Sequence, residues 1–264
     1  MTPNYVEAIS DILRGVVSTD MWGRMGWQDV KRRYRRTVFG PFWASLSLAI
    51  FSLSIGLVWA NLWNMDPKEY LPYLTSGMMV WVLFSAFVTE GCLVFVSSEG
   101  LIKQLPVPYS MLICAMLWRN LITFAHNFVV YVPICIYAGL RPTGYMLLAV
   151  PGLIALCVNG IWIAIVLGLL CARYRDVQQV VISLLQVSMF VTPIFWSPAQ
   201  LSGSATFLVD SNMLYHYIEI VRSPLLGKPP SAWSWSMVLI ATMLGWGVAL
   251  FLFSRFRRRV PYWL

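Results

Sequence analysis

Long stretches without a charged residue constrain this chain more than any other feature of its sequence. Five cations lie between Lys31 and Arg36, and no charged residue follows until Asp66. About 20 consecutive apolar residues are enough to cross the hydrocarbon core of a bilayer. Only 11% of the 264 residues are charged, whereas soluble domains carry about 25%. The sequence therefore predicts an all-α integral membrane protein, with residues 1–264 forming a single transmembrane domain.

Apolar segments separated by short polar connections predict six membrane-spanning helices. The expected spans are residues 38–62, 71–96, 110–138, 145–171, 178–196 and 233–254. Cations flank a span mostly on its cytosolic side. With both ends of the chain inside, fourteen of the nineteen Lys and Arg residues fall in cytosolic segments and four in outer ones. This distribution predicts a multi-pass protein of the cytoplasmic membrane with both termini in the cytosol, and it disfavours the inverted topology.

The first 36 residues combine a helical apolar pattern with tryptophans and cations. Apolar residues recur at helical spacing over residues 5–17, and the next stretch interleaves Trp22 and Trp27 with charged residues. A helix of this composition suits the plane of the membrane interface. We expect residues 1–36 to form a cytosolic interface helix, with a small soluble helical hairpin as the alternative. It ends in a basic collar that includes Arg33, Arg35 and Arg36.

Three ionisable residues fall within the expected spans. Glu90 lies near the cytosolic end of the second span, where a carboxylate paired with a cation is favoured over a coupling-ion site. Arg119 lies about two turns into the third span, so its long side chain reaches the cytosolic face. His126 is expected to be a neutral, hydrogen-bonded interior residue rather than a transport group.

Residues 197–232 form the longest stretch between two expected spans. The pattern predicts a helix here, capped by Asp210 or Ser211. Its polar residues are expected on a solvated face: His216, Glu219 and Arg222. Its apolar residues predict short re-entrant helices that dip back into the membrane before the last span.

Two stripes of small residues predict close contacts between helices. They are Gly160, Ala164, Gly168 and Ala172 in the fourth span, and Ala241, Gly245 and Ala249 in the sixth. Small side chains let a neighbouring helix approach closely, whether it belongs to the same chain or to a second copy.

Motifs of enzyme catalysis and of nucleotide binding are absent from the sequence. No G-x-x-x-x-G-K-[ST] phosphate loop, H-E-x-x-H pair or metal-ligand spacing of cysteines occurs. The two histidines and eleven acids show no Ser/His/Asp arrangement. We therefore expect no enzyme activity, catalytic residue or metal site in this chain. It would be a passive conduit that depends on an energy source elsewhere, with a purely structural membrane protein as the alternative.

Four short motifs occur in a fixed order along the chain. They are RYRRTVFGPFW at 33–43, GLIKQLPVP at 100–108, RYRDV at 173–177 with TPIF at 192–195, and the segment 218–227 with its RSPLL core. In this order they resemble the membrane subunits of type II ABC transporters that export lipid-linked polysaccharide, the O-antigen, capsule and teichoic-acid export family. The resemblance covers nearly the whole chain.

The resemblance implies a homodimer that works with two copies of a separate ATP-binding subunit. That partner would bind ATP and Mg, and no cofactor is expected in this chain. Residues 99–108 would form a coupling helix seated on the ATPase, and residues 197–232, with Tyr217 and Arg222, would gate the outer exit. The expected ATPase contacts are Leu101, Ile102, Lys103, Leu105, Arg173, Arg175 and Asp176. The three aliphatic residues lie at helical spacing and would fill an apolar groove of the partner, with Lys103 at its rim.

Aromatic residues make up 15% of the chain, and sugar faces stack on aromatic rings. Rings placed within the spans are candidates for lining a channel: Trp59, Phe84, Phe87, Tyr131, Phe190 and Phe195. The expected function is that of a permease subunit in a bacterial exporter of lipid-linked polysaccharide, above all O-antigen. Its partners would be a second copy, the ATPase, the polysaccharide and membrane lipids, but no nucleic acid.

Three other functional classes stay open. A type II permease for teichoic acid, capsule, a drug or a lipid would share the fold. An ion-coupled secondary transporter would need more intramembrane charges and an inverted repeat. A membrane glycosyltransferase would need carboxylates clustered at one face, and in this sequence they are scattered.

Overall fold

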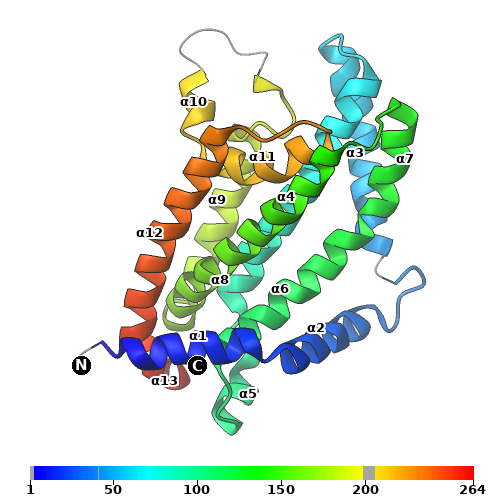
Figure 1. Cartoon of the computed structure of the whole chain (residues 1–264). Coiled ribbons are helices and arrows are strands. Elements are labelled where there is room, and N and C mark those ends of the chain that lie inside the picture. Colours follow the sequence, from blue (N-terminus) through cyan, green and yellow to red (C-terminus); the bar gives the residue numbers. More distant parts are fainter. Residues whose placement is uncertain (1–2, 41, 199–205) are drawn as a thin grey trace.

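The computed structural model describes residues 3–40, 42–198 and 206–264. The regular structure of these residues is entirely helical, which confirms the all-α prediction (Figure 1). Five helical stretches are long and apolar enough to cross a membrane: Phe42–Leu62, Pro67–Leu93, Tyr109–Ala138, Gly144–Arg173 and Ala232–Trp263. The chain is therefore a multi-pass membrane protein.

The long helices differ from the expected spans mainly at their ends. Helix α3 (Phe42–Leu62) begins four residues later than expected, and α4 (Pro67–Leu93) begins four residues earlier because Asp66 caps it through the Lys68 amide. The third stretch is divided at Asn127 into α6 (Tyr109–His126) and α7 (Phe128–Ala138). The remaining long helices are α8 (Ala149–Arg173), preceded by the short helix η2 (Gly144–Leu148), and α12 (Ala232–Phe256).

Helix α9 (Val177–Val191) is shorter than the other long helices. It has 15 residues, which correspond to about 22 Å of helix, whereas residues 178–196 were expected to span the membrane. The helix ends where Thr192 precedes Pro193, and Thr192 has an extended conformation that such a position favours. The sixth crossing therefore stays a prediction.

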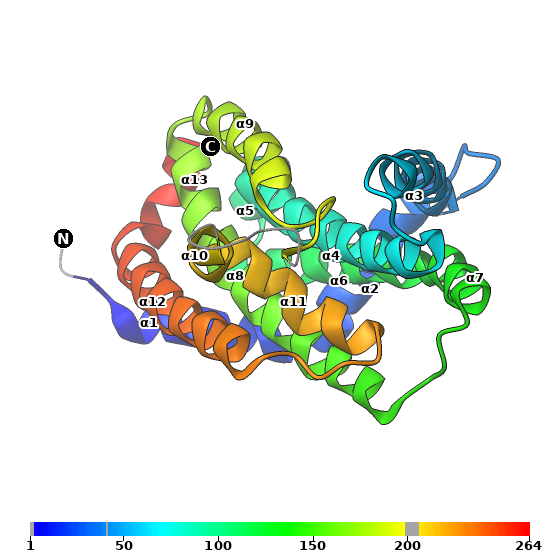
Figure 2. The same ribbon diagram turned by 90° about the horizontal axis from the view of Figure 1, so that it is seen from above.

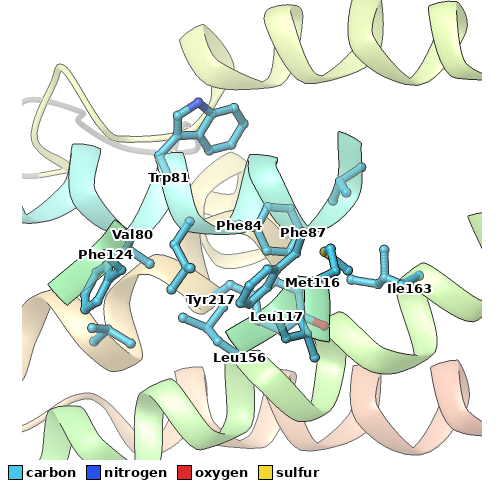
Figure 3. Close-up of a cluster of buried hydrophobic side chains, with 14 of the residues drawn as sticks. Val80, Trp81, Phe84, Phe87, Met116, Leu117, Phe124, Leu156, Ile163 and Tyr217 are labelled. Atoms are coloured by element: carbon cyan, nitrogen blue, oxygen red, sulfur yellow. The ribbon is translucent and has the colours of Figure 1, made fainter. Parts of the chain in front are cut away.

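Helix α4 forms the centre of the bundle. It packs against α3, α6, α7, α8, α9 and α11, and more than half of its residues are buried. Figure 3 shows its Val80, Phe84 and Phe87 among side chains from three other helices. These partners include Met116, Leu117 and Phe124 of α6, Leu156 and Ile163 of α8, and Tyr217 of α11.

The stripes of small residues meet partners within the same chain. A Cβ atom added to Gly160 would lie 2.9 Å from the Phe87 ring, and one added to Gly245 would lie 2.2 Å from the Trp162 ring. Gly91 of α4 faces Ala164 of α8 at a similarly short distance. The two stripes thus set the close approach of α8 to α4 and of α12 to α8.

One end of the bundle, here called the basal end, carries helices that lie across the long ones. Helices α1 (Tyr5–Val17) and α2 (Thr19–Tyr34) cross this end, and both chain termini lie there (Figure 1). Residues 1–36 are thus divided into two helices at Ser18 rather than forming one. Shorter elements complete this end: η1 (Val96–Ser98), α5 (Glu99–Gln104), η5 (Arg257–Arg259) and α13 (Val260–Trp263).

The opposite end, here called the distal end, carries α10 (Thr206–Asp210) and α11 (Met213–Leu225). Helix α11 lies across the ends of α4 and α8, as the view from above shows (Figure 2). Its cap is Asn212, whose side chain accepts hydrogen bonds from the amides of Leu214 and Tyr215. The expected cap at Asp210 or Ser211 was therefore wrong by one or two residues, and the re-entrant path stays a prediction.

Candidate functional site

The segment between α4 and α6 places a short helix, α5, at the basal end. Ile102 faces inward and is only 7% exposed, whereas Leu105 is 53% exposed and Leu101 is half-buried. Lys103 donates to the Glu99 carboxylate over 2.6 Å, and this hydrogen bond lowers the pKa of Glu99. Ile102 therefore belongs to the core of the chain, which removes it from the surface expected to meet the ATPase.

The other predicted contact residues lie in the turn between α8 and α9. Arg173, Arg175 and Asp176 are all exposed. The Arg173 guanidinium lies 5.0 Å from the centroid of the Tyr174 ring and 5.6 Å from that of Trp263. Helix α13 packs against both α5 and α8. Trp263 thus joins the same basal surface, and the only signal for it in the sequence is a tryptophan after a basic run.

The residues predicted for the interface helix and collar lie on α2 and just after it. Trp22 packs edge to face on Trp118 of α6, with ring centroids 5.9 Å apart. Trp27 is exposed and has the Lys31 ammonium 5.6 Å from its ring. Arg35 and Arg36 are exposed, whereas Arg33 takes part in an ion pair.

Glu90 is the centre of a charge cluster at the basal end, here called the Glu90 cluster. Arg33 of α2 donates to one of its carboxylate oxygens over 2.9 Å, and Arg119 of α6 donates to the other over 2.6 Å. Arg119 also pairs with Asp29 of α2 at 2.8 Å, and Asn120 donates to Glu90 at 2.7 Å. The predicted pairing of Glu90 with a cation is confirmed. Two arginines neutralise this carboxylate, so it is no free site for a coupling ion.

A cavity of about 680 Å³ lies between α2, α4, α5 and α6, next to the Glu90 cluster. Its walls combine arginines and serines with apolar side chains, among them Arg32, Arg33, Ser97, Leu93, Leu112 and Met116. Asp29, Glu90 and Arg119 also line this cavity, so the Glu90 cluster forms part of its wall.

A second polar cluster lies at the distal end around Arg222, whose side chain is 1% exposed. Arg222 donates to Glu219 from both Nε (3.0 Å) and Nη2 (2.6 Å), and to the Pro193 carbonyl from Nη1 (2.7 Å). Its guanidinium also lies 4.2 Å from the centroid of the Tyr73 ring. Burial alone would raise the pKa of Glu219, but the Arg222 charge and the bonds from Ser223 and Arg222 outweigh it, so the pKa is lowered.

The prediction that the polar residues of α11 form a solvated face was wrong. His216 is fully buried, and its Nδ1 lies 3.0 Å from the Ser234 hydroxyl while its Nε2 lies 2.9 Å from the Asp210 carbonyl oxygen. Helices α4, α8 and α12 surround α11, so its polar residues pair with one another and with these helices. A helical pattern alone does not distinguish a buried polar face from a solvated one.

Most of the predicted channel aromatics pack within the chain. Phe84, Phe87, Tyr131 and Phe195 are buried, and Trp59 is half-buried against Trp63. Phe84 stacks on Tyr217 with centroids 5.4 Å apart, and the Tyr131 hydroxyl donates to the Leu225 carbonyl. Phe190 differs, because it lies on α9 with 70% of its surface exposed. Burial favours a packing role for the first four rings and leaves Phe190 accessible.

The remaining sequence predictions concern the surroundings of His126 and the presence of a metal site. The His126 Nδ1 lies 2.7 Å from the Ile122 carbonyl oxygen, so this nitrogen carries the proton, and Phe42 packs edge to face on the ring. Within the described ranges, no group of three or more His, Cys, Asp or Glu side chains has a geometry suited to a metal ion.

Comparison with known proteins identifies the family. Residues 22–226 match the model of the ABC-2 type transporter family. The chain is 21% identical over 188 residues to the O-antigen export system permease protein RfbA of Klebsiella pneumoniae, covering 71% of this chain and 73% of that protein. It is 22% identical over 173 residues to the RfbA permease of Myxococcus xanthus, covering 64% and 65%. The family match includes most of α2, the Glu90 cluster, α5 and α11. The chain is thus a membrane subunit of the ABC-2 type transporter family.

Proposed function

We propose that this chain forms the membrane path of an ATP-driven exporter of lipid-linked polysaccharide, with O-antigen as the substrate. The observation that carries the proposal is the similarity to two O-antigen export permeases over more than 60% of the chain. The aromatic content supports a sugar substrate, because rings such as the exposed Phe190 offer stacking surfaces. Teichoic acid, capsule, a drug or a lipid are the alternative substrates.

The basal end is the cytosolic side in this proposal, and the membrane is the bacterial cytoplasmic membrane. Basic residues gather at this end on α2 and η5, as cytosolic flanks do. Helix α1 supports the assignment because Val6, Leu13 and Val17 form an exposed apolar face suited to the membrane interface. Helix α9 would make the sixth crossing, so that both termini are cytosolic and α10 and α11 form re-entrant elements on the outer side.

ATP hydrolysis belongs to a separate subunit, which holds ATP and Mg. Leu105, half-buried Leu101 and the exposed turn Arg173–Asp176 offer this partner an apolar contact within a charged rim. A second copy of the chain would complete the channel. Helix α9 supports this, because none of its residues is buried and Val180, Leu184 and Val187 form an exposed apolar stripe.

The distal end would form the outer gate. Tyr217 and Arg222 lie on α11 and contact α8 and the segment after α9, so they would hold the gate closed rather than touch solvent. An ion-coupled secondary transporter is disfavoured, because Glu90 and Arg119 are paired with each other and with α2.

Deletion of the gene in its own host tests the proposal. We expect surface polysaccharide to disappear and lipid-linked polysaccharide to accumulate inside the cell, with both restored by the intact gene. Purified alone, the chain should not hydrolyse ATP. Normal surface polysaccharide in the deletion strain, with a changed export of a drug or another lipid, would instead identify one of the alternative substrates.

A further inference from the structure

Asp11 of α1 is a buried carboxylate at the start of α6. Its side chain is 1% exposed. One carboxylate oxygen accepts hydrogen bonds from the Ser110 amide (3.1 Å) and the Ser110 hydroxyl (2.9 Å). The other accepts a hydrogen bond from the Tyr109 amide (3.2 Å). Arg257 donates to this second oxygen at 2.6 to 2.8 Å. We call this set the Asp11 cluster.

The Asp11 cluster joins three segments that are far apart in the sequence. Asp11 belongs to α1, Tyr109 and Ser110 begin α6, and Arg257 follows α12. The contact is tight as well as polar, because a Cβ atom added to Gly15 would lie 2.0 Å from the Ser110 hydroxyl oxygen. Free amides at a helix start favour a negative charge, so Asp11 satisfies them from a neighbouring helix.

The two clusters bound the coupling segment, here defined as residues 94–108. Glu90 lies one turn before its first residue, and Tyr109 follows its last. The Glu90 cluster fixes the first end to α2 through Arg33, and it fixes α6 to α2 through Arg119 and Asp29. The Asp11 cluster fixes the second end to α1. Each end of the segment is thus tied to a different interface helix.

We propose that Asp11 and Glu90 are positioning residues that make the coupling segment and the interface helices α1 and α2 move as one body. The inference rests on the proposed function, since the segment is the expected seat of the ATPase. A displacement of α5 by the partner would otherwise be lost in bending at the two ends of the segment. Because both ends are held, the displacement of α5 is transmitted to α1, α2 and the basal ends of α4 and α6 together.

Asp11→Asn is the sharpest variant, because it keeps the size of the side chain. Each carboxylate oxygen of Asp11 accepts a hydrogen bond from a backbone N–H group. In Asp11→Asn, the side-chain NH2 group would replace one of these oxygens and would face a backbone N–H, donor against donor. Arg257 would also lose its counter-charge. Glu90→Gln weakens the other cluster because it removes the negative charge that faces Arg33 and Arg119. Glu7→Gln is the matched control, because Glu7 lies on the same helix and pairs with Arg258 outside the cluster.

The experiment uses the assembled complex with its ATPase and measures polysaccharide exported per ATP hydrolysed, a ratio independent of the amount of folded complex. We expect Asp11→Asn and Glu90→Gln each to lower this ratio by about fivefold or more, and Glu7→Gln to leave it unchanged. Ser110→Ala keeps both charges and removes one donor, so it should lower the ratio less. This milder variant decides the question if Asp11→Asn does not assemble.

Amide hydrogen exchange over residues 105–112 gives a readout that needs no transport. We expect faster exchange in Asp11→Asn than in the unmodified complex, and no change in Glu7→Gln. Unchanged exchange, or an unchanged export ratio in a variant whose exchange is faster, would overturn the inference. An unmodified complex that exports no polysaccharide would overturn the proposed function instead, while the exchange comparison would still test the cluster.

Discussion

The guanidinium of Arg222 donates from Nη1 to the Pro193 carbonyl oxygen over 2.7 Å, so a side chain of α11 holds the segment that follows α9. Tyr73 of α4 supports the same segment by donating to the carbonyl oxygens of Pro193 and Trp196. Side chains, rather than a continued helix, thus hold residues 193–196.

Replacing Arg222 should destabilise the protein strongly. Arg222→Gln leaves the partly buried Glu219 carboxylate without its cation and leaves Tyr73 as the remaining donor to the Pro193 carbonyl, a loss of about 3 kcal/mol in the free energy of unfolding. Thermal unfolding of the purified protein in detergent measures it. Arg141→Gln, at an exposed position near the same end, should leave the unfolding temperature nearly unchanged. Equal effects of the two changes would contradict the structural role of Arg222.

Acid should weaken the distal end through Glu219. Its pKa lies below the ordinary value of 4.5, so its contribution to stability is complete above that value and is lost as the pH falls through the lowered pKa. We expect the unfolding temperature to fall below about pH 4.5 in the unmodified protein and to fall less steeply in Glu219→Gln. Parallel pH profiles of the two proteins would show that other carboxylates dominate.

Substitutions at Ile102 and Leu105 should have different effects: the first should lower stability and the second should weaken partner binding. Ile102→Ala removes a buried side chain and should lower the free energy of unfolding by about 2 kcal/mol or more. Leu105→Ala alters an exposed side chain, so it should leave stability unchanged but weaken co-purification of the ATPase, by about 1 kcal/mol or more in binding free energy. Lys103→Ala, at the charged rim, should be milder. Intact ATPase binding by Leu105→Ala would show that the contact lies elsewhere.

Two glycines provide a matched test of helix packing. A Cβ atom at Gly152 would lie 2.5 Å from the Ile220 carbonyl oxygen, so Gly152→Ala should push α11 away from α8 and lower the unfolding temperature. A Cβ atom at Gly247 would meet no atom within 4 Å, so Gly247→Ala should be neutral or slightly stabilising. The reverse order would show that α11 packs differently against α8.

Labelling from outside the cell tests the topology. In a cysteine-free background, a cysteine at exposed Arg141 should react with an impermeant thiol reagent in spheroplasts, and one at exposed Lys103 should react only after lysis. Labelling of Lys103→Cys in sealed spheroplasts would place the basal end outside and would remove the ATPase from α5.

The sequence predicted those features that depend on local composition. Glu90 could be expected to pair with a cation because it lies at a basic membrane edge, and the structure supplies Arg33 and Arg119. It could not predict the Asp11 cluster, because the residues it joins are 98 and 246 positions apart. A helical pattern shows which residues share a face, but not whether another helix covers that face. The burial of His216 and Ile102 follows from such covering and was missed for that reason.

The shortness of α9 has a consequence for the surrounding lipid. Its 15 residues reach about 22 Å, whereas the hydrocarbon core of a bilayer is about 30 Å thick. A crossing built on this helix therefore carries a hydrophobic mismatch, which a bilayer relieves by thinning locally. The non-helical backbone from Thr192 to Trp196 would lie in the thinned zone. There, Tyr70, Tyr73 and Arg222 donate to the carbonyl groups of Pro193, Phe195 and Trp196 in place of water. Acyl chain length in the host membrane thus becomes a variable on which the packing of this segment depends.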